Sequence, residues 1–133
     1  MSTTGFAPEV EAQIIARDLG CCARCGGHVV HLERVRAWVI HHRRPRGSGG
    51  TVIVWVNLAA NGIVLCARCH DWVESNRRRA RELGFLVPLN GIVKADEVPI
   101  KHKTLGHVRL NDEGGWTAVT DDPTPESNWG AAA

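Results

Sequence analysis

The sequence predicts a small α+β domain, and three observations lead to that prediction. Residues 8–19 and 70–83 have the apolar spacing of amphipathic helices. Residues 29–42 are rich in β-branched and aromatic side chains, as strands are. Two Cys-x-x-Cys pairs flank this strand-rich segment and could tie its ends together through a metal. At 133 residues the chain has the size of one domain, whose modest core a structural metal would supplement.

The predicted elements divide the chain into four parts. An N-terminal helix belongs to residues 1–20, because a proline suits its first turn and a glycine follows its last. Residues 21–84 form the core and end with the second helix, which a glycine also terminates. Residues 85–120 read as a β-rich extension with Pro and Gly between short apolar runs, and residues 121–133 as a disordered polar tail.

Within the core, the strand prediction is strongest over residues 37–41, and a basic, glycine-rich loop follows over residues 43–50. Residues 51–56 are apolar enough for another strand or for a buried loop. The dipeptide Asn61-Gly62 indicates a turn, after which a short apolar run leads into the second cysteine pair.

The two cysteine pairs predict a structural zinc site. Cys22 with Cys25, and Cys66 with Cys69, supply four thiolates, which satisfy a tetrahedral Zn²⁺. The separation of the pairs exceeds that of a compact zinc ribbon, so other structure must lie between the two halves. Cys21 could replace Cys22 as a ligand, although the Cys22–Cys25 spacing matches the second pair better. A four-thiolate site has no open position, so this zinc would stabilise the fold rather than take part in a reaction.

A histidine pair and a run of arginines lie between the two halves of the zinc site. At the end of a strand, His41 could bind a divalent cation while neutral His42 takes a proton from water. The predicted phosphate contacts are forked guanidinium donors, although a solvated helix face is the simpler reading of the second cluster. These residues are Arg43, Arg44, Arg46, Arg77 and Arg78.

The combined pattern, Cys-x-x-Cys, then His-His, then Asn-x-x-x-Leu-Cys-x-x-Cys-His, resembles the HNH endonucleases. These enzymes have a ββα-metal (His-Me finger) core, and the closest likeness is to the four-cysteine type common in bacteriophages. The resemblance covers residues 20–84. It implies a metal-dependent hydrolase that nicks or cuts DNA and leaves 5′-phosphate and 3′-hydroxyl ends.

By that resemblance, each conserved position of the motif acquires a role. His41 and His70 become ligands of a catalytic Mg²⁺, Mn²⁺, Ni²⁺ or Zn²⁺, with His41 standing where relatives often have an acidic residue. His42 becomes the general base, and Asn61 holds the catalytic loop or assists at the metal. Asn57 is an alternative to Asn61, and Glu74, one helical turn after His70, could support the metal or form a surface pair.

The resemblance also suggests partners and a setting. DNA is the expected partner, and phage terminase or portal proteins are possible ones if cleavage accompanies genome packaging. Up to residue 82 there are 12 Lys and Arg against 7 Asp and Glu, a basic balance that suits nucleic acid. We expect a cytoplasmic protein without a membrane span or signal peptide. Two other classes stay open: a non-catalytic zinc-bound DNA-binding or interaction module, and a thiol redox protein.

Overall fold

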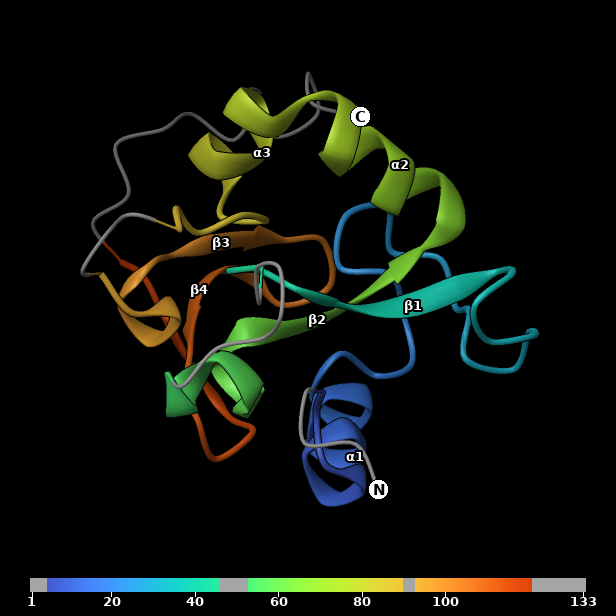
Figure 1. The fold of residues 1–133 in the computed structure, drawn as a ribbon, viewed down its shortest axis with the longest axis horizontal. Helices are drawn as coiled ribbons and strands as arrows, with labels where there is room; N and C mark the ends of the chain where they lie inside the picture. Colours follow the sequence, from blue (N-terminus) through green and yellow to red (C-terminus); the bar gives the residue numbers. More distant parts are fainter. Residues whose placement is uncertain (1–4, 46–52, 90–92, 121–133) are drawn as a thin grey trace.

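A two-stranded hairpin followed by a helix lies at the centre of the computed structural model, which describes residues 5–45, 53–89 and 93–120 (Figure 1). Strand β1 (Trp38–His42) pairs antiparallel with β2 (Gly62–Cys66), and helix α2 (Ala67–Ser75) begins directly after β2. The register places Trp38 opposite Cys66 and His42 opposite Gly62. The hairpin therefore carries a cysteine at one end and the histidine pair at the other.

The described residues contain two more α-helices, and the predicted α+β class is confirmed. Helix α1 (Pro8–Arg17) lies on the opposite side of the hairpin from α2, while α3 (Arg77–Leu83) follows α2 (Figure 1). Short 3₁₀ helices η1 (Val54–Asn57), η2 (Ala59–Asn61) and η3 (Ala95–Glu97) fill the connections. No described helix is long and apolar enough to cross a membrane.

The second sheet is a three-stranded antiparallel meander that lies within the segment expected to be rich in strands. Its strands are β3 (Ile100–His102), β4 (Gly106–Leu110) and β5 (Trp116–Ala118). Apolar side chains of this sheet share one buried cluster with those of β2 and α2, including Ile63, Val73 and Val108. The C-terminal extension thus belongs to the same hydrophobic core as the hairpin.

Two local predictions differ from the structure, and one of the two alternatives for residues 51–56 is not observed among the described ones. Only residues 38–42 of the strand-rich segment form a strand, because Val35 adopts a positive φ within a turn. The apolar segment 51–56 forms no strand in its described part, where η1 begins at Val54. The helix expected over residues 70–83 starts earlier, at Ala67, and is interrupted at Asn76, where φ is −130° and ψ is 52°.

Helix α1 packs closely on the hairpin because Gly62 has no side chain. A Cβ at Gly62 would collide with Ile14 and would lie 2.9 Å from the ring of Phe6. Ile14 is fully buried in the second apolar cluster, together with Trp38 and Val64. Phe6, just before α1, is thereby held against the end of the hairpin that carries His42.

A buried polar network joins α1 to both sheets. The carboxylate of Asp18 accepts hydrogen bonds from His102 Nε2 at 2.9 Å, Arg17 Nε at 2.8 Å and the Val64 amide at 2.9 Å. Burial alone would raise the pKa of Asp18, but hydrogen bonds from His102 and Arg17 hold it below 3.8. His102 Nδ1 accepts from the amides of Thr104 and Leu105, so both ring nitrogens of His102 are engaged in contacts within the fold.

We expect Asp18→Asn to destabilise the fold by about 3–5 kcal/mol, because it leaves the buried Arg17 without its counter-ion. The folded pKa of Asp18 lies below its unfolded value, so its contribution is complete above 3.8 and is lost only as the pH falls through the folded value. Denaturant unfolding should therefore give the same deficit at about pH 5 and about pH 8. A deficit that changes across this range would assign the effect to another titrating group.

Candidate metal centres and nucleic-acid interface

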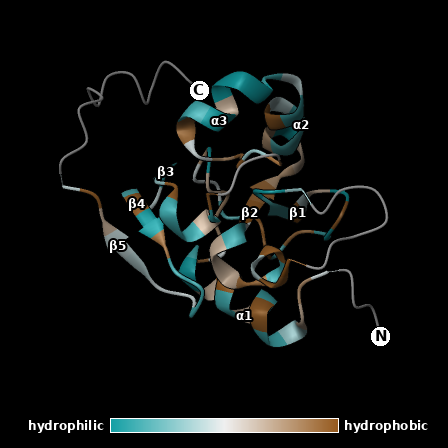
Figure 2. Cartoon of the chain, turned by 60° about the vertical axis from the view of Figure 1, so that its left-hand side comes forward, coloured by the Kyte–Doolittle hydropathy of each residue, from teal (hydrophilic) through white to brown (hydrophobic). Residues whose placement is uncertain are grey.

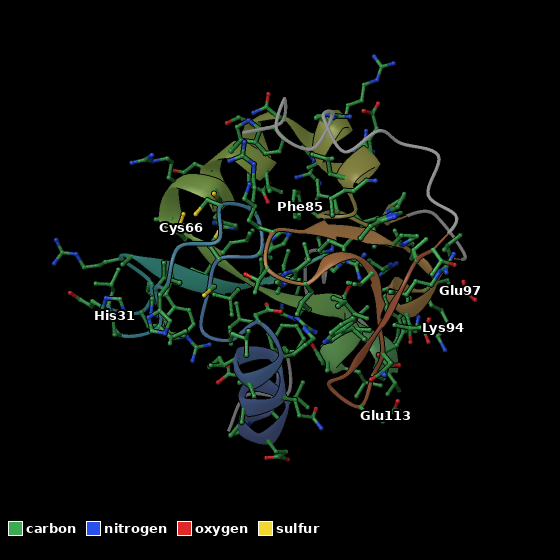
Figure 3. The ribbon with its side chains drawn as sticks, turned by 180° about the vertical axis from the view of Figure 1, so that it is seen from behind. His31, Cys66, Phe85, Lys94, Glu97 and Glu113 are labelled. Atoms are coloured by element: carbon green, nitrogen blue, oxygen red, sulfur yellow. The ribbon has the colours of Figure 1, made fainter. Side chains whose placement is uncertain are left out.

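The four predicted zinc ligands converge in the structure. The sulfur atoms of Cys22, Cys25, Cys66 and Cys69 all lie within 4.8 Å of one another, and Cys25 Sγ is 3.9 Å from Cys66 Sγ. Tetrahedral Zn²⁺ with bonds of about 2.3 Å fits sulfur atoms at such separations. The cluster is thus compatible with a structural zinc ion. Figure 3 labels Cys66, which lies toward the opposite end of the molecule from Lys94, Glu97 and Glu113.

Local backbone geometry brings the two halves of the cluster together. The Gly26 amide donates to the Cys22 carbonyl at 2.8 Å, and Gly26 has a φ of +83°, which favours glycine. The Ala23 amide donates to the Val64 carbonyl at 2.7 Å and thereby fixes this turn against β2. On the other side, the Cys66 sulfur accepts from the Cys69 amide at the N-terminus of α2. Each pair is therefore held by a tight turn.

The electrostatics of the cluster suit a metal ion. A hydrogen bond from the Cys69 thiol lowers the pKa of Cys22 to about 4, and the shared proton raises the pKa of Cys69. The first proton therefore leaves this pair more readily than the second, and zinc would displace the thiol protons that remain in the cluster. Arg24 stacks on Trp72 at 3.8 Å and donates to Cys69 Sγ at 3.4 Å, so it would offset negative charge. Cys21 instead directs its thiol to the Leu19 carbonyl.

A second group of possible ligands consists of His41, His70 and Glu74. One ligand atom from each lies within 4.8 Å of the others, and the rings of His41 and His70 are 5.4 Å apart. His41 comes from β1, whereas His70 and Glu74 are one turn apart on α2. The three residues line an open groove of about 400 Å³ together with His42 and Pro45.

His41 is prepared for a ligand role by its surroundings. It is buried, and its Nε2 donates to the Phe85 carbonyl at 3.0 Å, which leaves Nδ1 with the lone pair. Burial lowers the pKa of His41 to about 3, so the ring stays neutral at physiological pH. Phe85 follows α3 and is labelled in Figure 3, so a backbone group outside the sequence motif orients this imidazole.

The side chain of His42 contacts other residues than that of His41 does. Its Nε2 donates to the Asn57 side-chain oxygen at 2.9 Å, and in the neutral ring Nδ1 then carries the lone pair. The ring of Phe6 stacks on it at 4.0 Å with an interplanar angle of 12°. These two contacts fix both the tautomer and the orientation of the imidazole beside the possible cation ligands.

The two asparagines divide the expected roles between them. Asn61 is fully buried, and its side chain bonds to the Arg44 amide and carbonyl and to the Val56 carbonyl, at 2.7 to 3.1 Å. It therefore holds the backbone after the histidine pair, and in the described part of the chain its side chain bonds to that backbone rather than to the possible cation ligands. Asn57, the alternative, is the residue that touches His42.

The structure corrects the expectation that Arg43 contacts DNA. Its side chain is fully buried, and burial lowers its pKa to about 9 while leaving it charged at neutral pH. Its guanidinium donates to four backbone carbonyls at 2.7 to 3.1 Å: those of Gly84, Ala60, Ala95 and Val98. Arg43 therefore joins the hairpin to the segments after α3, and its fully buried guanidinium is out of reach of a phosphate.

The other predicted DNA contacts differ in exposure. Arg44 is 8% exposed and donates to the Leu89 carbonyl at 2.8 Å, so little of it remains for phosphate. Arg77 and Arg78 are exposed on α3, and Arg77 donates to Glu74 at 2.7 Å. Hydrophilic residues dominate the visible side of α2 and α3 (Figure 2). Arg46 lies outside the described residues.

Comparison with known proteins adds no identification, because no family model, curated protein or solved structure matches the chain. The two clusters therefore rest on their own geometry. Sequence reasoning gave Phe6 no role at the site, and it has no motif signal; only the packing of α1 brings its ring to His42.

Proposed function

We propose that this chain is a metal-dependent endonuclease of the HNH type that hydrolyses DNA phosphodiester bonds. The observation that supports it is the convergence of His41, His70 and Glu74 around one point, with His42 on the same groove. A hairpin followed directly by a helix supplies all four side chains, which is the arrangement expected of a ββα-metal core. The four-cysteine cluster accounts for how so small a unit is held together.

In this proposal His42 acts as the general base. Its Nδ1 carries the lone pair because Nε2 is committed to Asn57, so it can accept the proton of an attacking water. Stacking by Phe6 keeps the ring from rotating, and Asn57 stabilises the imidazolium that forms. Asn61 holds the following loop and is a positioning residue rather than a catalytic one.

His41, His70 and Glu74 would hold the catalytic cation, and Phe85 would orient His41 through its carbonyl. Such an ion would supply Lewis-acid stabilisation of charge on the scissile phosphate. Two imidazoles and one carboxylate favour Mn²⁺, Ni²⁺ or Zn²⁺ over Mg²⁺, which prefers oxygen ligands. Exposed arginines of α3 would hold the DNA backbone with little sequence preference. A role in phage DNA packaging with terminase remains part of the proposal.

Plasmid nicking by zinc-loaded protein tests this function, with EDTA, Mg²⁺, Mn²⁺ or Ni²⁺ added. We expect cleavage that requires a divalent ion and falls by about 100-fold or more in His70→Ala. His31→Ala removes an exposed imidazole outside the cation groups and should leave nicking unchanged. Bound zinc without cleavage in any metal would overturn the proposal in favour of a non-catalytic zinc module, and equal nicking by His70→Ala would expose a contaminating nuclease.

A further inference from the structure

A second hollow adjoins the groove of the candidate catalytic cluster. It has a volume of about 470 Å³ and is lined by Pro45, Arg77, Arg81 and residues 86–89. Pro45 also lines the groove that contains His41, His42, His70 and Glu74, so the two hollows are neighbours. A pocket of this volume falls within the range of small-ligand sites, about 300–1,000 Å³.

The two walls of the pocket differ in chemistry. Helix α3 contributes Arg77 and Arg81, which are one turn apart and so share a helix face. Arg77 donates to Glu74 at 2.7 Å, while Arg81 has no side-chain partner among the residues that the structure describes. The opposite wall is the apolar run Leu86-Val87-Pro88-Leu89. The pocket therefore pairs two guanidinium groups with an apolar surface.

The apolar wall is held in place by the buried arginines. The Val87 amide donates to the Arg43 carbonyl at 2.8 Å, and Arg44 donates to the Leu89 carbonyl at 2.8 Å. Both arginines immediately follow the histidine pair in β1. The pocket wall and the candidate catalytic groove are thus connected through the same short segment of backbone, and the wall is formed before any ligand arrives.

We propose that this pocket receives one unpaired nucleotide of the substrate, next to the bond that is cut. A nucleotide combines a phosphate, which guanidinium groups bind, with a base whose flat face suits an apolar wall. A paired base cannot leave the helix without loss of stacking, whereas an unpaired one enters such a pocket at low cost. The substrate assignment rests on the proposed nuclease function, and it predicts a preference for DNA with an unpaired nucleotide near the cut.

Binding of dAMP and of inorganic phosphate tests the pocket without any cleavage. Each is titrated by NMR into protein that has zinc in the four-cysteine cluster and no cation in the candidate catalytic cluster. We expect dAMP to bind about 10-fold more tightly than phosphate, and Arg81→Ala to remove that difference. Arg109→Ala removes the same charge from an exposed position on β4, outside the pocket, and should shift dAMP affinity by less than about twofold. Equal affinity for dAMP and phosphate, or equal losses in both variants, would overturn the proposal.

Cleavage of matched duplexes provides the second measurement. A duplex with one unpaired nucleotide should be cut about 10-fold faster than the fully paired duplex, and Arg81→Ala should reduce this ratio toward one. A protein that binds dAMP at Arg81 but cuts neither duplex would overturn the nuclease function while retaining the nucleotide pocket. A protein that cuts both duplexes equally would overturn the pocket's role and retain the nuclease.

Discussion

Cys66→Ser will yield a chain that neither retains zinc nor unfolds cooperatively. Cys66 is a possible zinc ligand, and its sulfur also accepts a hydrogen bond from the Cys69 amide at the start of α2. Structural zinc sites contribute roughly 10–16 kcal/mol of apparent binding free energy, which matches or exceeds the whole stability of a typical domain. Zinc content by elemental analysis and thermal unfolding by circular dichroism are the measurements.

Cys21→Ser is the matched control for this experiment. It makes the same chemical change directly beside Cys22, but the Cys21 thiol bonds to the Leu19 carbonyl and is outside the four-sulfur cluster. We expect it to keep one zinc per chain and nearly the same melting temperature. If Cys66→Ser unfolded as cooperatively as zinc-loaded Cys21→Ser, zinc would not be the support that we infer.

His42→Ala should reduce DNA cleavage by about 1,000-fold or more while leaving affinity for the catalytic cation nearly unchanged. The reason is that His42 is outside the cation group of His41, His70 and Glu74, although it lines the same groove. Single-turnover nicking rates and calorimetric Mn²⁺ titration separate the two effects. His70→Ala should lose both properties, so the pair of variants distinguishes a base from a ligand.

Asn57→Ala supplies a graded control for the same inference. It removes the acceptor of His42 Nε2 but leaves the imidazole in place, so cleavage should fall by about 10–100-fold. Wild-type cleavage rates in His42→Ala would remove His42 from the base role and leave Asn57 as a structural contact.

The sequence predicted the α+β class and the convergence of the four cysteines because both depend on short-range patterns. Helical and strand periodicities act over a few residues, and the short Cys-x-x-Cys spacing places both cysteines of a pair in one turn. The burial of Arg43 could not be predicted in this way. A basic run after a strand looks solvent-exposed, and only tertiary contacts with the backbone after α3 show that its guanidinium donates to backbone carbonyls inside the core.

The same distinction explains the two asparagines and Glu74. Motif spacing singled out Asn61, whose buried amide holds the loop, but the contact between Asn57 and His42 requires the 3₁₀ turn of η1. Glu74 was recognisable as a neighbour of His70 on one helix face. That His41 from β1 joins them depends on how α2 crosses the hairpin, which no local pattern encodes.

Cys69 and His70 are consecutive residues of α2, and they belong to two different cation groups. Neighbouring helix positions point about 100° apart, so the two sides of this one turn each face a different group of possible metal ligands. A rotation of the turn that relaxed one coordination sphere would necessarily distort the other. A structural ion of another radius in the four-cysteine cluster would therefore shift His70 relative to His41 and Glu74.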